Sequence, residues 1–425
     1  MPVIFYRIYV CLLAFILFLS VACSEKDKWE YDPDGDQDPD YKNLDGDSDD
    51  EAEALGEKDS EQGAEDGDAN GDADRPPEED LSKLGQIKEG WPEPVLHDPS
   101  YGKVNQVLVK DDKLYLATFD GMHILDISEA EKPVHLGSIK PNENAPYYNE
   151  TKRLLLDGNH LYAIFTKFDA DNGALMAMDV SKPQKPTISH THKIEITTGY
   201  DQLGSSYVQT LTDIKLHDDK LWVNRMDSGI FIFDLDNPAT PDVNTYLGFE
   251  NFDWSEYGSN ILNFNENILA TAGNSGIATV DIENWPEIEV IGHIKKYGSN
   301  NIDFLRVGNT GIYVSSRVHI VNVRQAQFPK ILFSIKEPRL PKAADVSDYR
   351  LYIAYGYEHS EYSPAGLAVY DISNWENPDE WALISDLTSD SGLLDVQVVG
   401  DYAYAGGYNG LYIYHCFKGE PETTD

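Results

Sequence analysis

The sequence has few cysteines, and none of them can pair with another inside the body of the chain. Three are present: Cys11 and Cys23 lie within or directly after the N-terminal apolar run, and Cys416 lies near the other end. A chain of this kind must rely on its hydrophobic core for stability. Cys416 lies in the apolar stretch YIYHCF, which is typical of a buried small hydrophobic residue and not of a nucleophile.

Positive charge is also scarce. The chain has 33 Lys and Arg against 74 Asp and Glu, which gives a formal net charge of −41. Such a balance argues against nucleic acid and against anionic membrane surfaces as partners. About half of this charge lies between Ser24 and Asp80, where 25 acidic residues face 5 basic ones, a net of −20.

The common catalytic motifs are missing from the sequence. It contains no G-x-S-x-G, no H-E-x-x-H and no phosphate-binding glycine loop. His190 and His192 lie two residues apart, but no third metal ligand can be named, so a pair of surface histidines is the favoured interpretation. We therefore expect no metal and no cofactor in the body of the chain.

One long hydrophobic run is present, and it is short for a membrane span. About fifteen apolar residues follow Arg7, whereas a transmembrane helix needs roughly 20. The run ends LSVAC, which resembles the lipobox of bacterial lipoproteins, although Ser20 stands where Leu is usual. The resemblance implies a signal peptide over residues 1–22 and lipidation of Cys23. An ordinary signal peptide that happens to be followed by a cysteine is the alternative.

Lipidation implies an exported protein that meets the membrane only through its lipid anchor. Ser24 follows the cysteine, and in the sorting rule known for enterobacteria this implies the outer membrane of a Gram-negative cell. The domain could then face either the periplasm or the outside, and the sequence leaves both open.

The acidic segment that follows predicts a disordered tether over residues 23–81. It has almost no aliphatic residues, so it cannot bury enough surface to offset the entropy of ordering. The runs DPDGDQDPD (32–40) and DGDSDDEAE (45–53) place alternating Asp as calcium loops do, but both lack the Gly and Glu that an EF-hand loop requires. A solvated linker is favoured over an ordered calcium site, and weak calcium binding is an expectation of both interpretations.

Beyond residue 82 the chain consists of short β-rich runs separated by turn residues, and it repeats itself. The third run of each copy ends at Asp126, Asp179, Asp234, Asp281, Asn322, Asp371 and His415. The intervals of 41 to 55 residues, with four short runs A to D in each, are typical of propeller blades. In six copies a glycine precedes strand C: Gly121, Gly173, Gly229, Gly276, Gly366 and Gly410. These repeats predict an all-β, seven-bladed β-propeller over residues 82–418, followed by a disordered tail at 419–425.

The phrases DISEAEKP, DVSKPQKP, DLDNPATP and DISNWENP resemble the LVIVD-repeat family of bacterial and archaeal surface or exported proteins. The resemblance extends over about residues 84–417. It implies a β-propeller and little about function.

The last copy stops after strand C, at HCFKGEPETTD. The stretch LGQIKEG, residues 84–90, resembles the strand D phrases HLGSIKPN and VIGHIKKYG of other copies. We therefore expect this N-terminal stretch to complete the last blade and close the ring with hydrogen bonds between the chain ends.

The loops predict a binding face. The A–B and C–D turns are short and repetitive, whereas the B–C and D–A loops vary in length and are rich in aromatic residues. We expect the latter to share one face and to meet a protein or a glycan, because aromatic loops on a rigid scaffold suit recognition. The candidate residues are Tyr147, Tyr148, Tyr200, Tyr207, Trp254, Tyr257, Tyr357, Tyr362 and Tyr408. The alternative is that many of these rings pack beneath the loops.

A second group of candidates stands at the start of strand A, where the innermost strands would line a channel mouth. It consists of Gln106, Arg153, Asp213, Asn260, Asp303, Asp345 and Asp395. Gathered carboxylates would raise one another's pKa values or bind a cation. The favoured alternative is that each carboxylate accepts hydrogen bonds from nearby backbone and joins one blade to the next.

Three functional hypotheses follow from these features. The first is a non-enzymatic binding or scaffold lipoprotein of the cell envelope. The second is a hydrolase or lyase that uses the channel-mouth carboxylates, with or without a metal. The third is a purely structural envelope component.

Overall fold

The computed structural model divides the chain into two units, residues 1–69 and 70–425, and every residue described below belongs to the second. The described ranges are 94–140, 150–166, 172–195, 198–200, 206–208, 211–225, 229–248, 259–265, 268–273, 276–283, 289–295, 303–307, 310–314, 317–322, 327–335, 340–356, 365–374, 377 and 380–416. Within them, no helix is long and apolar enough to cross a membrane.

The second unit is built from four-stranded antiparallel sheets, each serving as a propeller blade. Six blades use strands that are consecutive in the chain. The first two contain β2 (Val104–Lys110), β3 (Lys113–Thr118), β4 (Gly121–Asp126) and β5 (Val134–Ile139), then β6 (Thr151–Asp157), β7 (His160–Phe165), β8 (Asn172–Asp179) and β9 (Thr187–Glu195). The next two contain β12 (Leu211–His217), β13 (Lys220–Arg225), β14 (Gly229–Asp234) and β15 (Asp242–Gly248), then β16 (Ser259–Asn265), β17 (Ile268–Gly273), β18 (Gly276–Asp281) and β19 (Glu289–Lys295). The last two contain β20 (Asp303–Val307), β21 (Thr310–Val314), β22 (Val318–Asn322) and β23 (Lys330–Ile335), then β24 (Pro341–Ser347), β25 (Arg350–Tyr355), β26 (Ala365–Asp371) and β27 (Ala382–Ser389).

One further four-stranded sheet combines both ends of the described chain. It contains β28 (Leu393–Val399), β29 (Tyr402–Gly407), β30 (Gly410–His415) and, on the outside, β1 (Leu96–Asp98). The 3₁₀ turn η2 (Pro99–Tyr101) follows β1, and a two-stranded sheet of β10 (Thr198–Tyr200) and β11 (Ser206–Val208) lies between β9 and β12 in the chain. The structure thus has six contiguous blades, and the predicted seventh exists only as this composite sheet.

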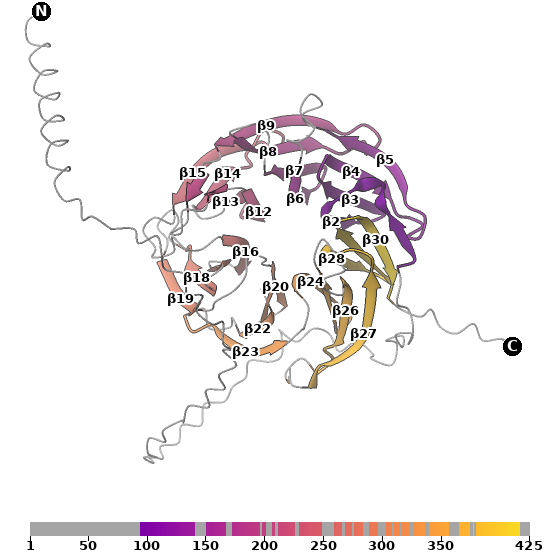
Figure 1. The fold of residues 1–425 in the computed structure, drawn as a ribbon. Helices are drawn as coiled ribbons and strands as arrows, with labels where there is room; N and C mark the ends of the chain where they lie inside the picture. The colour runs from indigo at the N-terminus through magenta and orange to yellow at the C-terminus, as the bar shows by residue number, and fades with distance from the viewer. Residues whose placement is uncertain are drawn as a thin grey trace, which may run out of the picture. The chain divides into compact units, whose positions relative to one another are not determined.

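The sheets are arranged radially, with strand A of each sheet innermost (Figure 1). Successive inner strands contact one another in the order β2, β6, β12, β16, β20, β24 and β28, and β28 contacts β2. The core lies between neighbouring sheets. One of its clusters joins Val104 and Leu114 of the first blade to Tyr404, Leu411 and Ile413 of the composite sheet. Because both sheets contribute side chains to this buried cluster, the hydrophobic effect stabilises the contact between them, which closes the ring.

The predicted closing strand is wrong in position. Residues 84–90 lie outside the described part of the chain, and the strand that pairs with β30 is β1, at Leu96–Asp98. The ring of His97 stacks on Tyr412 with centroids 4.3 Å apart, and the Val95 backbone N–H donates to the Ile413 carbonyl over 2.8 Å. The side chain of Leu96 adds to this pairing, because it packs against the buried cluster between the composite sheet and the first blade.

The glycine before strand C shows that β1 takes the place of a fourth strand. Gly121, Gly366 and Gly410 all have φ between 130° and 151°. A Cβ atom at Gly121 would lie 2.2 Å from the Ile139 carbonyl oxygen of β5, and one at Gly410 would lie 2.3 Å from that of Asp98 in β1. The same close approach therefore occurs in an ordinary blade and in the composite sheet, which explains why glycine is used in both.

Candidate binding face

The B–C turns and the entries to strand A lie at one end of the blades, which we call the entry face. The Phe119 N–H donates to the Lys103 carbonyl over 3.0 Å, and the Tyr408 N–H donates to that of Gly392 over 3.0 Å. The Thr151 hydroxyl of the second blade donates to the Gly121 carbonyl of the first over 2.7 Å. Neighbouring blades are therefore joined directly at this face.

The A–B and C–D connections lie at the opposite end of the blades. Aspartates in the C–D connections form hydrogen bonds within their own turns. The carboxylates of Asp126, Asp179, Asp281 and Asp371 each accept from the backbone N–H two residues later, at 2.8 to 2.9 Å. The Ser128 hydroxyl and N–H, helped by Lys113, lower the pKa of Asp126 to about 2. The Asp that ends strand C therefore accepts a hydrogen bond from the turn that follows it at these positions.

Six of the inner strands carry a β-bulge just after they enter the sheet. In β2 the register passes from Val104 opposite Thr118 to Gln106 opposite Ala117, so Asn105 is the extra residue. The same register shift occurs in five other inner strands, where the extra residue is Lys152, Thr212, Ile261, Lys342 or Leu394. A bulge turns a side chain away from the regular pleat, and bulges are common beside functional sites.

Side chains that follow the bulge join each inner strand to the next. Two of the acceptors stand one residue after the bulge of their strand. The Gln106 side-chain oxygen accepts from the Leu154 N–H over 2.5 Å, and the Asp395 carboxylate accepts from the Val107 N–H over 2.9 Å.

Two other acceptors stand three residues after the bulge of their strand. The Gln397 side-chain oxygen accepts from the Val109 N–H over 2.6 Å, and the Asp345 carboxylate accepts from the Val398 N–H over 2.7 Å. Inner strands are sheet edges, so these acceptors satisfy N–H groups that have no partner in the ladder.

The predicted channel-mouth residues do not form one ring. Gln106, Arg153, Asp213 and Asp395 share the position after the bulge, but Asp345 lies two residues beyond its equivalent, Ala343, and Asn260 precedes its bulge. Asp213 is buried, with Oδ2 3.8 Å from the Lys215 Nζ. The backbones of Asn260 and Asp303 lie in β16 and β20, and their side chains are outside the described part. An inserted residue leaves no mark in the residue types of a repeat, so the equivalence predicted from the sequence fails at Asp345 and Asn260.

Of the predicted aromatic residues, the structure describes the side chain of Tyr408, which lies in the turn between β29 and β30. The Lys103 Nζ lies 5.9 Å from the centroid of its ring. Tyr200 and Tyr207 belong to the β10–β11 pair, with only their backbones described. The other predicted aromatic residues and Cys23 lie outside the described residues: Tyr147, Tyr148, Trp254, Tyr257, Tyr357 and Tyr362.

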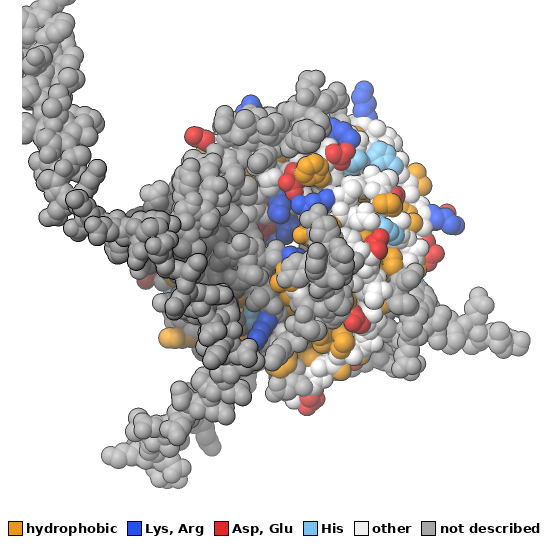
Figure 2. All heavy atoms as spheres, viewed as in Figure 1, with side chains coloured by type: hydrophobic (Ala, Val, Ile, Leu, Met, Phe, Trp, Pro, Cys, Tyr) orange, Lys and Arg blue, Asp and Glu red, His pale blue; other side chains and the backbone are white. Residues whose placement is uncertain are grey.

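Among the described residues, four cationic ones belong to the entries of the inner strands, and we call them the entry cations: Lys103, Lys152, Arg153 and Lys342. Lys103 donates to the Glu150 carboxylate over 2.9 Å, and Arg153 donates to the Asn105 carbonyl over 3.3 Å. Lys and Arg side chains gather near the middle of the ring in Figure 2, in a chain that is otherwise strongly acidic. Of these four residues only Arg153 is predicted from the sequence, because the lysines are scattered along the chain and two of them are bulge residues.

Burial is the main cause of the pKa shifts among the entry cations, and for Lys152 the neighbouring positive charges add to it. Burial, followed by the charges of Arg153 and Lys103, lowers the pKa of Lys152 to about 8, and Lys342 contributes in the same direction. Burial also lowers the pKa of Lys342 to about 8. Both side chains are half-buried, so they lie among protein atoms yet still meet solvent. Burial raises the pKa of Glu150, but Lys103, Lys152 and Asn105 together outweigh it, and the net shift is downward.

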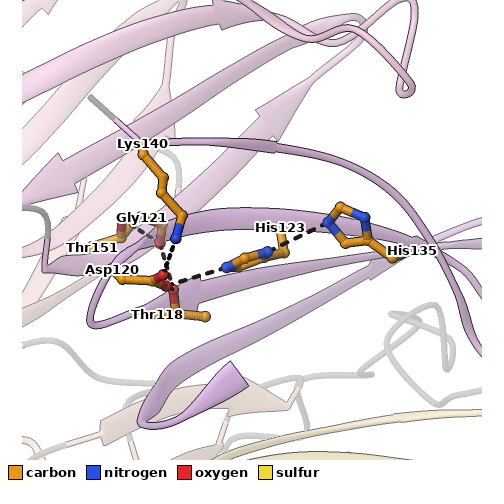
Figure 3. A network of polar contacts seen from close by, with 7 residues as sticks. All are labelled: Thr118, Asp120, Gly121, His123, His135, Lys140 and Thr151. Atoms are coloured by element: carbon orange, nitrogen blue, oxygen red, sulfur yellow. Dashed lines mark hydrogen bonds and ion pairs between the residues drawn. The ribbon is translucent and has the colours of Figure 1, made fainter. Parts of the chain in front are cut away.

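A second polar network lies at the outer part of the first blade and was not predicted (Figure 3). Asp120 accepts from Thr118 over 2.9 Å and from Lys140, and lies 3.3 Å from the His123 Nε2. The His123 Nδ1 in turn lies 3.5 Å from the His135 Nε2. His123, then Lys140 and Thr118, hold the pKa of Asp120 well below its usual range. Nothing in the sequence signals this contact, because the histidines meet through a register shift between Ile124 and Leu125.

Two features of the described residues bear on chemical reactivity: the Asp120–His123–His135 series and the thiol of Cys416. The Asp120–His123–His135 series has the order of a carboxylate–histidine relay, but in the described part of the chain its further partners, Thr118 and Lys140, donate to the carboxylate end and not to the histidine end. Cys416 is buried, and burial raises the pKa of its thiol to about 12, which suppresses the reactive thiolate. Among the described residues, no group of three or more His, Cys, Asp or Glu side chains is placed to hold a metal ion.

Comparisons with known proteins agree with the fold. Residues 101–140 match the family model of the LVIVD repeat. A search of the curated proteins finds no match.

Three solved structures resemble the chain at 10 to 11% identity, which supports the fold alone. The β-propeller domain of Myceliophteria thermophila Cps50 (Swd1) has a TM-score of 0.54 at 11% identity, over 74% of this chain and 96% of that one. The computationally designed Ika8 protein has 0.51 at 11%, over 78% of this chain and all of that one. A chain of the mitotic checkpoint complex has 0.52 at 10%, over 87% of this chain and all of that one. The chain is therefore a repeat β-propeller protein of four-stranded blades that carries an LVIVD repeat.

Proposed function

We propose that this chain is an exported lipoprotein, anchored through Cys23, whose propeller binds a protein or glycan partner without catalysing a reaction. The composite sheet counts as the seventh blade of this binding module. The N-terminal apolar run and the cysteine after it support the anchor, and the acidic segment would hold the propeller away from the membrane. The outer membrane is the proposed location.

The observation that carries the proposal is the contrast between the two faces. At the entry face, Lys103, Lys140 and Tyr408 present charged and aromatic groups at the rim and centre of the ring. At the opposite face, the aspartates that end strand C accept hydrogen bonds from their own turns. Charged and aromatic groups on a rigid scaffold suit recognition of another molecule.

The engagement of the inner-strand acceptors favours binding over the hydrolase or lyase alternative. Asp345 and Asp395 accept hydrogen bonds from the backbone of the next blade. A carboxylate that holds two strands together is a poor general acid or base, because proton uptake would remove an acceptor from the structure. A purely structural component would contact other copies of itself through both faces, and crosslinking from each face separates this alternative from binding of a partner at one face.

Photo-crosslinking from the two faces tests the binding role. A photoreactive amino acid at Tyr408 on the entry face, or at Lys132 on the opposite face, would be incorporated into the full chain in intact cells. Lys132 is 80% exposed, so its replacement disturbs little. We expect one discrete crosslinked species from position 408 and none from position 132. Equal crosslinking from both positions would favour repeated self-contact of a structural component, and none from either would refute a partner at the entry face.

Metabolic labelling with palmitate tests the anchor. The Cys23→Ser chain should lose the label and move from the membrane fraction to the soluble exported fraction, because one thiol carries the lipid. A Cys11→Ser chain is the matched control and should keep the label. Retention of the label in Cys23→Ser would rule out this anchor.

A further inference from the structure

His135 occupies a position at which the other contiguous blades have an aliphatic residue. It is the residue of β5 that lies directly before the bulge of this strand, and it pairs with Leu125. Its equivalents by register in the other five blades are Ile188, Val243, Val290, Ile331 and Leu383. An aliphatic side chain therefore satisfies the fold at this position, so the fold itself does not explain a histidine there.

The bulge brings His135 to the side of the blade on which His123 lies. Because β5 has one extra residue at this point, His135 and Ser138 share the face of His123 although they are three residues apart. Ser138 stands opposite His123, yet the imidazole ring of His135 approaches that of His123, with centroids 5.6 Å apart. In the fifth blade the equivalent histidine, His319, has its Nδ1 2.6 Å from the hydroxyl of Ser334, which stands opposite. The first blade thus has a second imidazole in addition to the pattern of the fifth.

The distance between the two rings suits a shared metal ion better than a hydrogen bond. The His123 Nδ1 and the His135 Nε2 lie 3.5 Å apart (Figure 3). Good hydrogen bonds from nitrogen are about 2.7 to 3.2 Å long, so a direct bond between the rings is weak. Two nitrogens that bind one tetrahedral zinc ion at about 2.0 to 2.1 Å lie about 3.3 Å apart. The observed separation is within about 0.2 Å of that value, which is the tolerance expected of a metal site.

Asp120 favours the form of His123 that can bind a metal through Nδ1. Its carboxylate lies 3.3 Å from the His123 Nε2, and it accepts from the Thr118 hydroxyl over 2.9 Å and from Lys140. With the imidazole hydrogen on Nε2 and directed at this carboxylate, His123 presents an unprotonated Nδ1 to His135. Metal-binding histidines almost always donate their other N–H to a carboxylate, a carbonyl or water, which orients the ring.

The pair is held firmly on one side and is open on the other. The side chain of His123 is only 13% exposed, and the ring of Tyr101 packs against it in a T-shaped contact with centroids 5.2 Å apart. His135 is exposed, so its ring can turn toward an ion that arrives from solvent. Two imidazoles leave two positions of a tetrahedral ion for water or for a ligand of another molecule.

We propose that His123 and His135 form a binding site for a divalent transition-metal ion such as zinc, with Asp120 as the carboxylate that orients His123. The ion binds to the His123 Nδ1 and the His135 Nε2, and water fills its remaining positions. Imidazole ligands favour zinc, copper and nickel over calcium and magnesium, which prefer oxygen. Spacing in the sequence, on which the expectation of no metal depends, does not reveal a pair of residues on two different strands. The site does not require the partner proposed for the entry face.

Isothermal calorimetry with zinc tests the site directly. The chain without its signal peptide would be titrated with zinc in an excess of calcium, which occupies carboxylates of the acidic segment and competes poorly for imidazole. We expect one zinc site per chain that persists in calcium. His135→Ile should remove this site, and the variant should fold, because isoleucine stands at the same place in the second and fifth blades.

Two further variants assign the roles. His190→Gln is the matched control, because His190 and His192 form another close pair in the sequence, and it should leave the zinc affinity unchanged. Asp120→Asn keeps an acceptor for the His123 Nε2 but removes its charge, and it should weaken zinc about tenfold. Electron paramagnetic resonance of bound copper should show two nitrogen ligands in the unaltered chain and in Asp120→Asn, but at most one in His135→Ile. Two nitrogens with a lower affinity would identify Asp120 as a positioning residue and not a ligand.

Three results would contradict the proposal. Absence of a zinc site that persists in calcium would refute it, as would a site that His135→Ile leaves intact. Loss of the site in His190→Gln would assign the ion to the other pair of histidines. Unchanged zinc affinity in Asp120→Asn would exclude the orienting role of that carboxylate. The crosslinking experiment at Tyr408 leaves both histidines unaltered, so its outcome is independent of these results.

Discussion

Replacing Gly366 by alanine should destabilise the propeller by about 3 to 5 kcal/mol or prevent its folding, the range of severe steric substitutions in a core. Gly366 has φ +151°, and an added Cβ would lie 1.8 Å from the Leu387 carbonyl oxygen in the neighbouring strand β27. That oxygen belongs to the backbone of a paired strand, so it cannot swing away as a side chain would. Both the local conformation and the sheet would have to change.

Gly400→Ala provides the matched control for this result. Gly400 also has positive φ, at +57°, but no atom lies within 4 Å of the place where its Cβ would stand. This substitution should cost only the backbone strain of an alanine in the left-handed region, roughly 1 to 2 kcal/mol. Chemical denaturation of the two variants would measure both values. Similar losses at the two positions would show that the close approach to Leu387 contributes nothing.

The class of fold followed from the sequence because the repeat is a property of local pattern. Alternating apolar residues, the glycine before strand C and the aspartate after it each act within a few residues, and the structure has them where predicted at Gly121, Asp126 and Asp371. Single residues at turns obey conformational rules that do not depend on distant parts of the chain.

The closing strand and the site could not be placed in this way because they depend on pairing. LGQIKEG resembles a strand D more closely than LHD does, yet β30 pairs with Leu96–Asp98 through a stacked histidine. Likewise, residue type alone predicts that Asp345 and Asp395 are equivalent, whereas the bulges separate their positions by two residues. Lys152 and Lys342 carry no signal in the sequence for the same reason, since only the register identifies them as bulge residues. Such features arise between strands and leave no local signal.

Removing the N-terminal strand β1 should cause the second large loss of stability. A chain that begins at Tyr101 loses β1, the His97–Tyr412 stack, the Val95 hydrogen bond to Ile413 and the 2.9 Å contact of the His97 Nε2 with the Asn409 carbonyl. With about 1 kcal/mol for each hydrogen bond or aromatic pair, the loss is on the order of 4 kcal/mol. It also uncovers the edge of β30, which then becomes a template for association with other chains.

The entry face depends on this closure. Asp395 of β28 accepts from Val107 of β2 only because the composite sheet and the first blade are neighbours. The same neighbourhood brings Lys103 over the ring of Tyr408. If the chain ends did not share a sheet, Lys103 and Tyr408 would not be held together, and the proposed binding face would lose this contact.

The most direct test is therefore to compare the unfolding of two truncated chains, one that begins at Pro94 and one that begins at Tyr101. Guanidinium denaturation followed by tyrosine and tryptophan fluorescence would give the free energy of unfolding of each. The account predicts that the Pro94 chain is as stable as the chain without its signal peptide. It predicts that the Tyr101 chain is less stable by about 4 kcal/mol. Equal stability of the two truncated chains would contradict closure of the ring through β1.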